Sequence, residues 1–227
     1  PLPTVDASLG TNKQIIIDGV RPTFVSAEEF DTDNNGTIDR VSITMSEPVN
    51  DAAVAFGDFT LGSGVTPTSI VSASGVNGDG SATDNIITLA VTSTESSSFT
   101  VGYSGTSVQD LAGNTANSNS SISVTDLADP IILSVTSSIG NGAYNEGDLI
   151  PIQVTFSEVV SYTTGATAPS IALATGATTV SQDAVLASGN GTKILVFEYT
   201  VQADDESADL NYVNVDALSL NTGTITD

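Results

Sequence analysis

Short runs in which apolar and polar residues alternate recur along this chain, and they predict an all-β protein. In residues 40–46, Val41, Ile43 and Met45 fall on one face and polar residues on the other. Residues 152–156 alternate in the same way. Gly, Asn, Asp and Pro turns separate such runs, residues 77–80 predict one hairpin turn, and no convincing amphipathic helix is found. The pattern therefore predicts β-sandwich architecture, in which each strand buries one face.

The pattern of strands occurs twice, which indicates tandem modules. The matched segments are 41–49 with 152–160, 99–103 with 208–212, and 108–110 with 225–227. Each copy also opens after a strand, an aspartate, three residues and a proline, so that Asp18 precedes Pro22 as Asp126 precedes Pro130. The sequence predicts two Ig-like β-sandwiches, at residues 22–129 and 130–227, the second without its own closing strand.

The leading segment, residues 1–21, predicts a closing strand that belongs to a preceding module or acts as a donor strand. Two explanations stay open. In the first, the chain is a fragment of a longer array, since its first residues, 1–4, do not form a signal peptide. Alternatively, the leading strand of one molecule completes the open second module of the next by β-strand addition, which gives a head-to-tail filament.

Residues 31–39 form the strongest candidate for a metal site. Calcium takes roughly 6–8 oxygen ligands, and a D-x-[DN]-x-[DN]-G loop offers them at every second position. The predicted ligands are Asp31, Asp33, Asn35, the carbonyl of Thr37, and Asp39. Ser42 stands where an EF-hand has glutamate, and a strand follows, so we expect a calcium loop between strands. A metal-free turn is the alternative, but three neighbouring carboxylates favour a cation.

Other acidic residues are weaker candidates. Asp18 and Asp126 are placed to share a cation at the start of each module, or to form Asx turns. Two loops of the second copy would need a cation if their carboxylates converged, and would otherwise form a solvated acidic rim. Their residues are Glu146, Asp148, Asp204, Asp205, Glu206 and Asp209. Glu47 and Glu158 follow the inward alternation of a strand, which favours a structural role over a contribution to metal binding.

The charge and composition exclude several functions. With 4 Lys and Arg against 27 Asp and Glu, the net charge of −23 argues against binding nucleic acid or an anionic membrane surface. It suits a protein that binds divalent cations. No apolar run is long enough to insert in a membrane, and the chain has no cysteine for disulfides.

An enzyme is not expected. Histidine and cysteine are absent, so the usual general bases and thiol nucleophiles are missing, and no G-x-S-x-G motif occurs. Carboxylates alone can serve a glycosidase, but these lie in solvated turns. Tryptophan is absent, and the five tyrosines are scattered, so sugar-stacking platforms are scarce.

Together these segments resemble the bacterial Ig-like, cadherin-like tandem repeats of large surface adhesins. The segments that carry the resemblance are 8–20, 31–39, 45–49, 110–114, 156–160 and 200–212. The resemblance implies β-sandwiches with Ca²⁺ at loops and linkers, in a stalk or spacer on the bacterial cell surface. Its implied partners are neighbouring modules or identical subunits. In the second copy residues 141–148 replace the calcium loop, and a ligand-binding adhesin tip is disfavoured because no long loop gathers aromatic residues.

Overall fold

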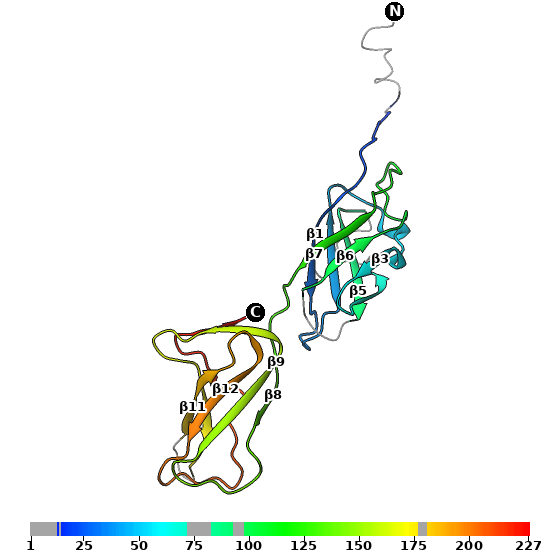
Figure 1. The fold of residues 1–227 in the computed structure, drawn as a ribbon. Helices are drawn as coiled ribbons and strands as arrows, with labels where there is room; N and C mark the ends of the chain where they lie inside the picture. Colours follow the sequence, from blue (N-terminus) through cyan, green and yellow to red (C-terminus); the bar gives the residue numbers. More distant parts are fainter. Residues whose placement is uncertain (1–12, 14, 72–82, 93–97, 177–180) are drawn as a thin grey trace, which may run out of the picture. The chain divides into compact units, whose positions relative to one another are not determined.

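The computed structural model describes residues 13, 15–71, 83–92, 98–176 and 181–227 (Figure 1). The segment 1–12, Gln14 and the predicted turn at 77–80 lie outside this part. The chain divides into two compact units. As far as they are described, the first comprises Pro1–Glu29, Arg40–Thr92 and Ser98–Thr125, and the second comprises Phe30–Asp39 and Asp126–Asp227.

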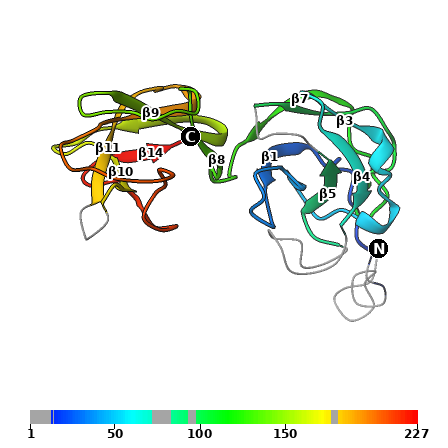
Figure 2. The ribbon, with the colours of Figure 1, turned by 90° about the horizontal axis from the view of Figure 1, so that it is seen from below.

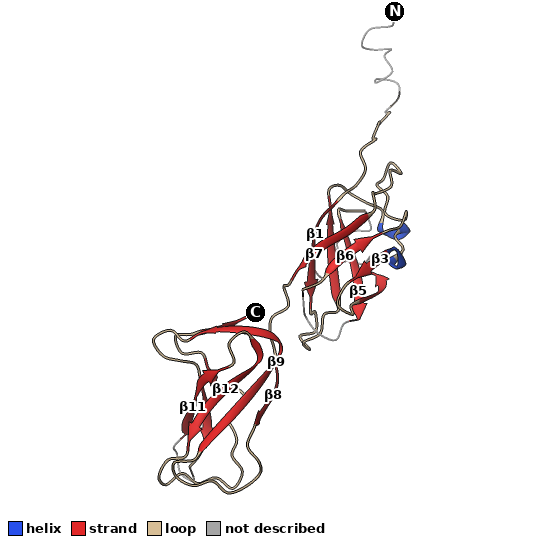
Figure 3. Cartoon of the chain, in the orientation of Figure 1, coloured by secondary structure: helices blue, strands red, loops and turns tan. Residues whose placement is uncertain are grey.

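The predicted all-β class is confirmed, since regular structure in the described residues consists of strands and two short 3₁₀ turns (Figure 3). The elements of the first unit are β1 (Phe24–Phe30), β2 (Arg40–Met45), η2 (Asp51–Ala53), η3 (Phe56–Asp58), β3 (Phe59–Leu61), β4 (Thr66–Ile70), β5 (Ile86–Thr92), β6 (Thr100–Tyr103) and β7 (Asn119–Thr125). Their hydrogen-bonded order is β3-β6-β7-β1-β2-β5-β4. Figure 2 shows the strands of this unit curling round on themselves.

Apolar and polar residues alternate along β2, and the apolar side chains form part of the core of the first unit, as predicted. Val41, Ile43 and Met45 are fully buried, and Ile43 lies opposite Ile87 of the antiparallel neighbour β5. The strand forms because β-branched residues at alternate positions pack well on one face of a pleated sheet. Tyr103 closes the other side of the core, where its hydroxyl accepts a 2.9 Å hydrogen bond from the backbone N–H of Val108.

The second unit has the same kind of core. Its strands are β8 (Ile132–Ser137), β9 (Leu149–Thr163), β10 (Ser170–Ala174), β11 (Ser181–Ser188), β12 (Thr192–Thr200), β13 (Leu218–Ser219) and β14 (Thr224–Thr226). The order is β13-β10-β11-β12-β9-β14, and β8 also pairs with β9. Val154 and Phe156 of β9 pack in the core with Leu195 and Phe197 of β12.

The two units differ at one strand. In the first unit β7 lies between β6, its antiparallel neighbour, and β1, its parallel neighbour. No counterpart of β7 occurs among the described residues of the second unit. The strand predicted in the leading segment is not formed in its described part, residues 13 and 15–21. A strand requires a hydrogen-bonded neighbour, and these residues have no ladder partner in the described chain.

No helix in the described part of the chain is long and apolar enough to cross a membrane.

Candidate metal centres

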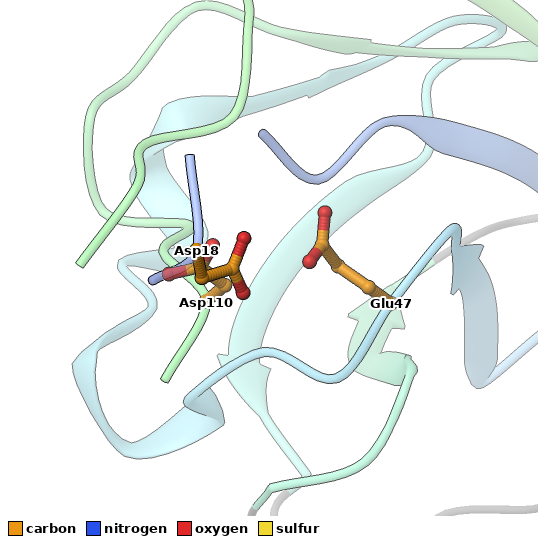
Figure 4. A group of neighbouring side chains, drawn as sticks. All are labelled: Asp18, Glu47 and Asp110. Carbon is orange, nitrogen blue, oxygen red and sulfur yellow. The ribbon is translucent and has the colours of Figure 1, made fainter. Parts of the chain in front are cut away.

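Three carboxylates from separate segments of the first unit meet in one place (Figure 4). Asp18 comes from the extended segment before β1, Glu47 from the turn after β2, and Asp110 from the loop between β6 and β7. Each offers an oxygen, and these oxygens lie within 4.8 Å of one another. Opposite ligands of a calcium ion lie roughly 5 Å apart, because each Ca–O distance is about 2.3–2.6 Å. The three carboxylates, which we call the first triad, therefore have a spacing that suits calcium.

The second unit holds an equivalent group, the second triad, formed by Asp126, Glu158 and Asp227 within the same 4.8 Å. Each member stands at the position that the repeat assigns to its counterpart. Asp126 corresponds to Asp18, Glu158 to Glu47, and Asp227 to Asp110. In the described part of the chain these are the two groups of three or more potential carboxylate ligands at such spacing.

A serine before each glutamate fixes the geometry of the triad. In the first unit the backbone N–H of Ser46 donates to the carbonyl of Thr23 at 2.9 Å, and its hydroxyl accepts from the Thr23 N–H at 3.0 Å. In the second unit Ser157 and Ile131 make the same two contacts, also at 2.9 and 3.0 Å. These bonds hold the segment that follows the aspartate of the triad against the residue next to the glutamate.

The aspartates at positions 18 and 126 also share a local conformation. Asp18 accepts a 3.0 Å hydrogen bond from the backbone N–H of Val20, and Asp126 accepts one of 3.1 Å from Ala128. These are Asx turns, the alternative that the sequence left open for both residues. Each aspartate uses one oxygen, Oδ1, in its turn, so the turn and a cation are compatible.

Asp110 is 5% exposed and is held by the D-L-A-G-N loop that it begins. Its Oδ1 accepts from the backbone N–H groups of Ala112 and Asn114 at 2.8 Å each, and its Oδ2 accepts from the Asn114 side chain at 2.8 Å. Burial raises the pKa of Asp110, but hydrogen bonds from Asn114, Ala112 and Gly113 outweigh it, so the pKa lies below its ordinary value. Asp110 is therefore a rigid carboxylate that stays ionised.

The environment of Glu47 shifts its pKa in the opposite direction from that of Asp110. Its Oε1 atom is buried and has no hydrogen-bond partner among the described residues. Burial raises the pKa of Glu47, and the charges of Asp18 and Asp110 raise it further. A buried polar atom that lacks a partner is costly, and a cation would compensate both the lost hydration and the repulsion. The donor set, carboxylate oxygens only, fits a hard cation such as Ca²⁺.

The predicted calcium loop at residues 31–39 has a different geometry. Asp31 accepts hydrogen bonds from the backbone N–H groups of Asn35 and Gly36, at 3.2 and 2.6 Å, and Asp39 binds the backbone N–H and the hydroxyl of Thr32. Asn35 likewise binds Thr37. Thus four of the five predicted ligand residues take part in hydrogen bonds inside the loop, and its aspartates do not form a group of three at 4.8 Å. Calcium binding by this loop stays a prediction.

The two acidic loops of the second unit do lie side by side. The N–H of Gly147 donates to the carbonyl of Val201 at 2.9 Å, and the N–H of Val201 donates to the carbonyl of Asp148 at 3.0 Å. Yet none of the carboxylates of Glu146, Asp148, Asp204, Asp205, Glu206 and Asp209 belongs to a group of three at 4.8 Å in the described chain.

Asp205 has a structural role within these loops. It accepts hydrogen bonds from the hydroxyl of Tyr199 and from the N–H of Gln202. Burial raises the pKa of Tyr199 to about 12, helped by its bond to Asp205. Burial raises the pKa of Asp205 too, but the hydrogen bonds from Tyr199 and Gln202 outweigh it and leave the pKa lowered. A metal at these loops stays a prediction.

Sequence reasoning proposed Asp18 and Asp126 as ligands, but it did not propose Asp110 or Asp227, and it assigned Glu47 and Glu158 to a structural role. The signal was present in the repeat. All three pairs of acids fall at matched positions of two copies that differ at most other positions. What the repeat could not show is that the three positions of one copy meet in space.

No family model matches the chain, and no curated protein matches it. Among solved structures, the chain is similar to the N-terminal part of the bacterial S-layer protein SbsC, with 15% identity and a TM-score of 0.36, over 91% of this chain and 44% of that one. It is also similar to domains 1–6 of SbsC, with 15% identity and a TM-score of 0.37, over 91% of this chain and 25% of that one. The chain thus spans less than half of these S-layer proteins.

Proposed function

We propose that this chain is a structural spacer in an extracellular bacterial surface protein, built from two β modules that calcium stiffens. The observation that carries the proposal is the duplicated carboxylate triad: Asp18, Glu47 and Asp110 in the first unit, and Asp126, Glu158 and Asp227 in the second. A catalytic carboxylate pair has no reason to recur at the start of every module. A structural ion does have a reason to recur, because each module has an entering segment that must be held in place.

The mechanism is the linkage between ion binding and folding. In each unit the aspartate that precedes the proline lies on the entering segment. Glu47 lies just after β2 and Glu158 lies within β9, and the third acid lies in the loop after β6 in the first unit and directly after β14 in the second. One ion would tie these three segments together. An ion that binds the folded chain and not the unfolded one stabilises the folded state by RT ln(1 + [L]/Kd). Such modules stiffen in calcium-rich surroundings outside the cell.

The motif resemblance supports a surface location, and the net charge of −23 supports a chain that works where divalent cations are abundant. Neighbouring modules of the same kind are the proposed partners, with no nucleic acid and no membrane insertion.

Isothermal titration with Ca²⁺ tests the proposal. We expect one ion per triad, hence two for the chain, and a further ion if the loop at residues 31–39 also binds. Asp18→Asn combined with Glu47→Gln should remove one ion, and Asp126→Asn combined with Glu158→Gln should remove another. Asp31→Asn, which leaves both triads intact, should not affect these two ions. Equal ion counts in the wild-type chain and both triad variants would refute the assignment.

A further inference from the structure

Asn35 and Gly36 form an asparagine–glycine pair, in which the asparagine side chain can react with the backbone that follows it. The nitrogen of the next residue attacks the side-chain amide carbon, and glycine favours this because it has no Cβ to obstruct the approach. The chain has four such pairs, at residues 35–36, 77–78, 141–142 and 190–191, and the structure describes all but 77–78. The asparagine is exposed in each of these three pairs, so exposure does not distinguish them. Their hydrogen bonds do.

The backbone N–H of Gly36 is directed at a carboxylate. It donates to Oδ2 of Asp31 at 2.6 Å. Oδ1 of the same carboxylate accepts from the N–H of Asn35 at 3.2 Å, which holds Asp31 beside both residues of the pair. A backbone nitrogen becomes a nucleophile only as it loses its proton, and a carboxylate within hydrogen-bond reach can accept that proton as a general base. Asp31 is therefore placed to activate the Gly36 nitrogen.

The side chain of Asn35 is held in the complementary position. Its Oδ1 accepts from the N–H of Thr37 at 2.8 Å and from the Thr37 hydroxyl. An asparagine that binds the N–H two residues on has its side chain folded over the intervening peptide group, which here contains the Gly36 nitrogen. When that nitrogen adds to Cγ of Asn35, negative charge develops on Oδ1, and the two donors already directed at this oxygen stabilise it.

We propose that the loop at residues 31–39 modifies itself, converting Asn35 to aspartate or isoaspartate through a cyclic imide, with Asp31 as general base and Thr37 as donor to the oxyanion. The Gly36 nitrogen forms a bond to Cγ of Asn35 while its proton passes to Asp31. The Cγ–Nδ2 bond then breaks, and ammonia leaves with that proton. Water opens the imide at either carbonyl, which gives the two products. The step consumes one water, releases one ammonia and involves no oxidation or reduction.

The product changes the charge of a loop that is already acidic. Aspartate at position 35 adds a fourth carboxylate to those of Asp31, Asp33 and Asp39, and isoaspartate adds the same charge and lengthens the main chain. Residue 35 is also one of the predicted calcium ligands, so the modification alters the donor set of the loop as the protein ages. The proposal goes beyond the spacer function and does not depend on bound calcium.

The other two described pairs provide references within the same molecule. The N–H of Gly191 donates to the carbonyl of Val160 at 2.9 Å, and a neutral carbonyl is a far weaker base than a carboxylate. Oδ1 of Asn190 accepts from the N–H of Tyr162 at 2.8 Å, which directs this side chain toward β9. The pair at 141–142 lies in the exposed loop between β8 and β9. We therefore expect Asn35 to react fastest and Asn190 slowest.

Peptide mapping by mass spectrometry, on chain aged at neutral pH in EDTA, measures the three rates, because cleavage after glutamate puts the three sites on separate peptides. Asn35 should react about tenfold faster than Asn141 or more, since a positioned general base typically contributes that much. Guanidinium chloride removes the hydrogen bonds of the loop, so the advantage of Asn35 over Asn141 should disappear in the unfolded chain.

Two variants with the same change of charge separate the base from the general acidity of the loop. Asp31→Asn keeps an oxygen that can accept the Gly36 N–H but removes the base, and it should slow the reaction of Asn35 about tenfold or more. Asp33→Asn removes one charge from the same loop and should leave the rate nearly unchanged. Thr37→Val removes the hydroxyl donor and should slow the reaction about tenfold. The rate at Asn141 in each sample and an unchanged melting temperature show that a variant is otherwise intact.

Three results would overturn the proposal. They are a folded chain in which Asn35 reacts no faster than Asn141, equal effects of Asp31→Asn and Asp33→Asn, and an advantage of Asn35 that persists in guanidinium chloride. A calcium titration that finds no ion at either triad would refute the proposed function but would leave these rates as they are.

Discussion

Glu47→Gln is the most informative single substitution, because the structure predicts opposite effects with and without calcium. Without calcium, burial and the charges of Asp18 and Asp110 raise the pKa of Glu47, which means that the ionised carboxylate destabilises the folded unit near neutral pH. Glutamine has nearly the same shape and no charge. In a chelator, therefore, Glu47→Gln should melt at the same temperature as the wild type or higher.

With calcium the sign reverses. At a free concentration of 100 Kd, one ion stabilises a unit by about 2.7 kcal/mol, and for a unit of about 100 residues this raises the melting temperature by about 10–20 °C. If the loss of one carboxylate weakens binding about hundredfold, the same concentration leaves about 0.4 kcal/mol, or about 2–3 °C. Glu47→Gln should then melt below the wild type.

Differential scanning calorimetry in EDTA and in calcium measures both effects, and each unit is expected to give its own transition. Glu28→Gln is the matched control, since Glu28 is exposed and belongs to neither triad. It should leave the calcium increment unchanged. The argument fails if Glu47→Gln lowers the melting temperature equally in both conditions. It also fails if the first unit of the wild-type chain melts at the same temperature in calcium as in EDTA.

Three further substitutions test local features of the fold. The pKa of Tyr199 is raised to about 12, so between about pH 10 and 12 the unfolded tyrosine has lost its proton while the folded one keeps it; the second unit should lose stability over this range in urea melts, and Tyr199→Phe should remove that loss. Ser157→Ala leaves the N–H of Ile131 without its 3.0 Å acceptor and should lower the free energy of unfolding of the second unit by about 1–3 kcal/mol. Ser46 is more exposed, so Ser46→Ala should destabilise the first unit less. Equal losses would show that burial does not decide the effect. Gly113→Ala should destabilise the first unit by about 1–2 kcal/mol in the same melts, because Gly113 has φ of 90° and the space around it is open, so that backbone strain alone contributes; an unchanged midpoint would contradict this.

Much of the fold could be predicted from short sequence patterns because a β-strand with one buried face leaves a period of two in the sequence. Residues 40–46 and 152–156 carried that period and form core strands. The segment 13–20 carried a similar apolar signal, yet it forms no strand in its described part. Local sequence gives the tendency to form a strand, but a neighbour with free backbone groups has to be supplied by another part of the fold.

The candidate site shows the same division. The loop at residues 31–39 has a local oxygen pattern, and in the structure Asp31, Asn35 and Asp39 bind groups of their own loop. The triad members have no common motif, because Asp18, Glu47 and Asp110 are separated by dozens of residues.

The sequence by itself determined that this chain is all-β and acidic, and it predicted two copies of one pattern, because alternation, charge and repetition are properties of residues near one another or of their sum. Only the tertiary structure decided which carboxylates meet and which strands pair. Both depend on bringing distant segments together, and the distance between two such segments is fixed by the packing of the whole unit rather than by the residues around either one.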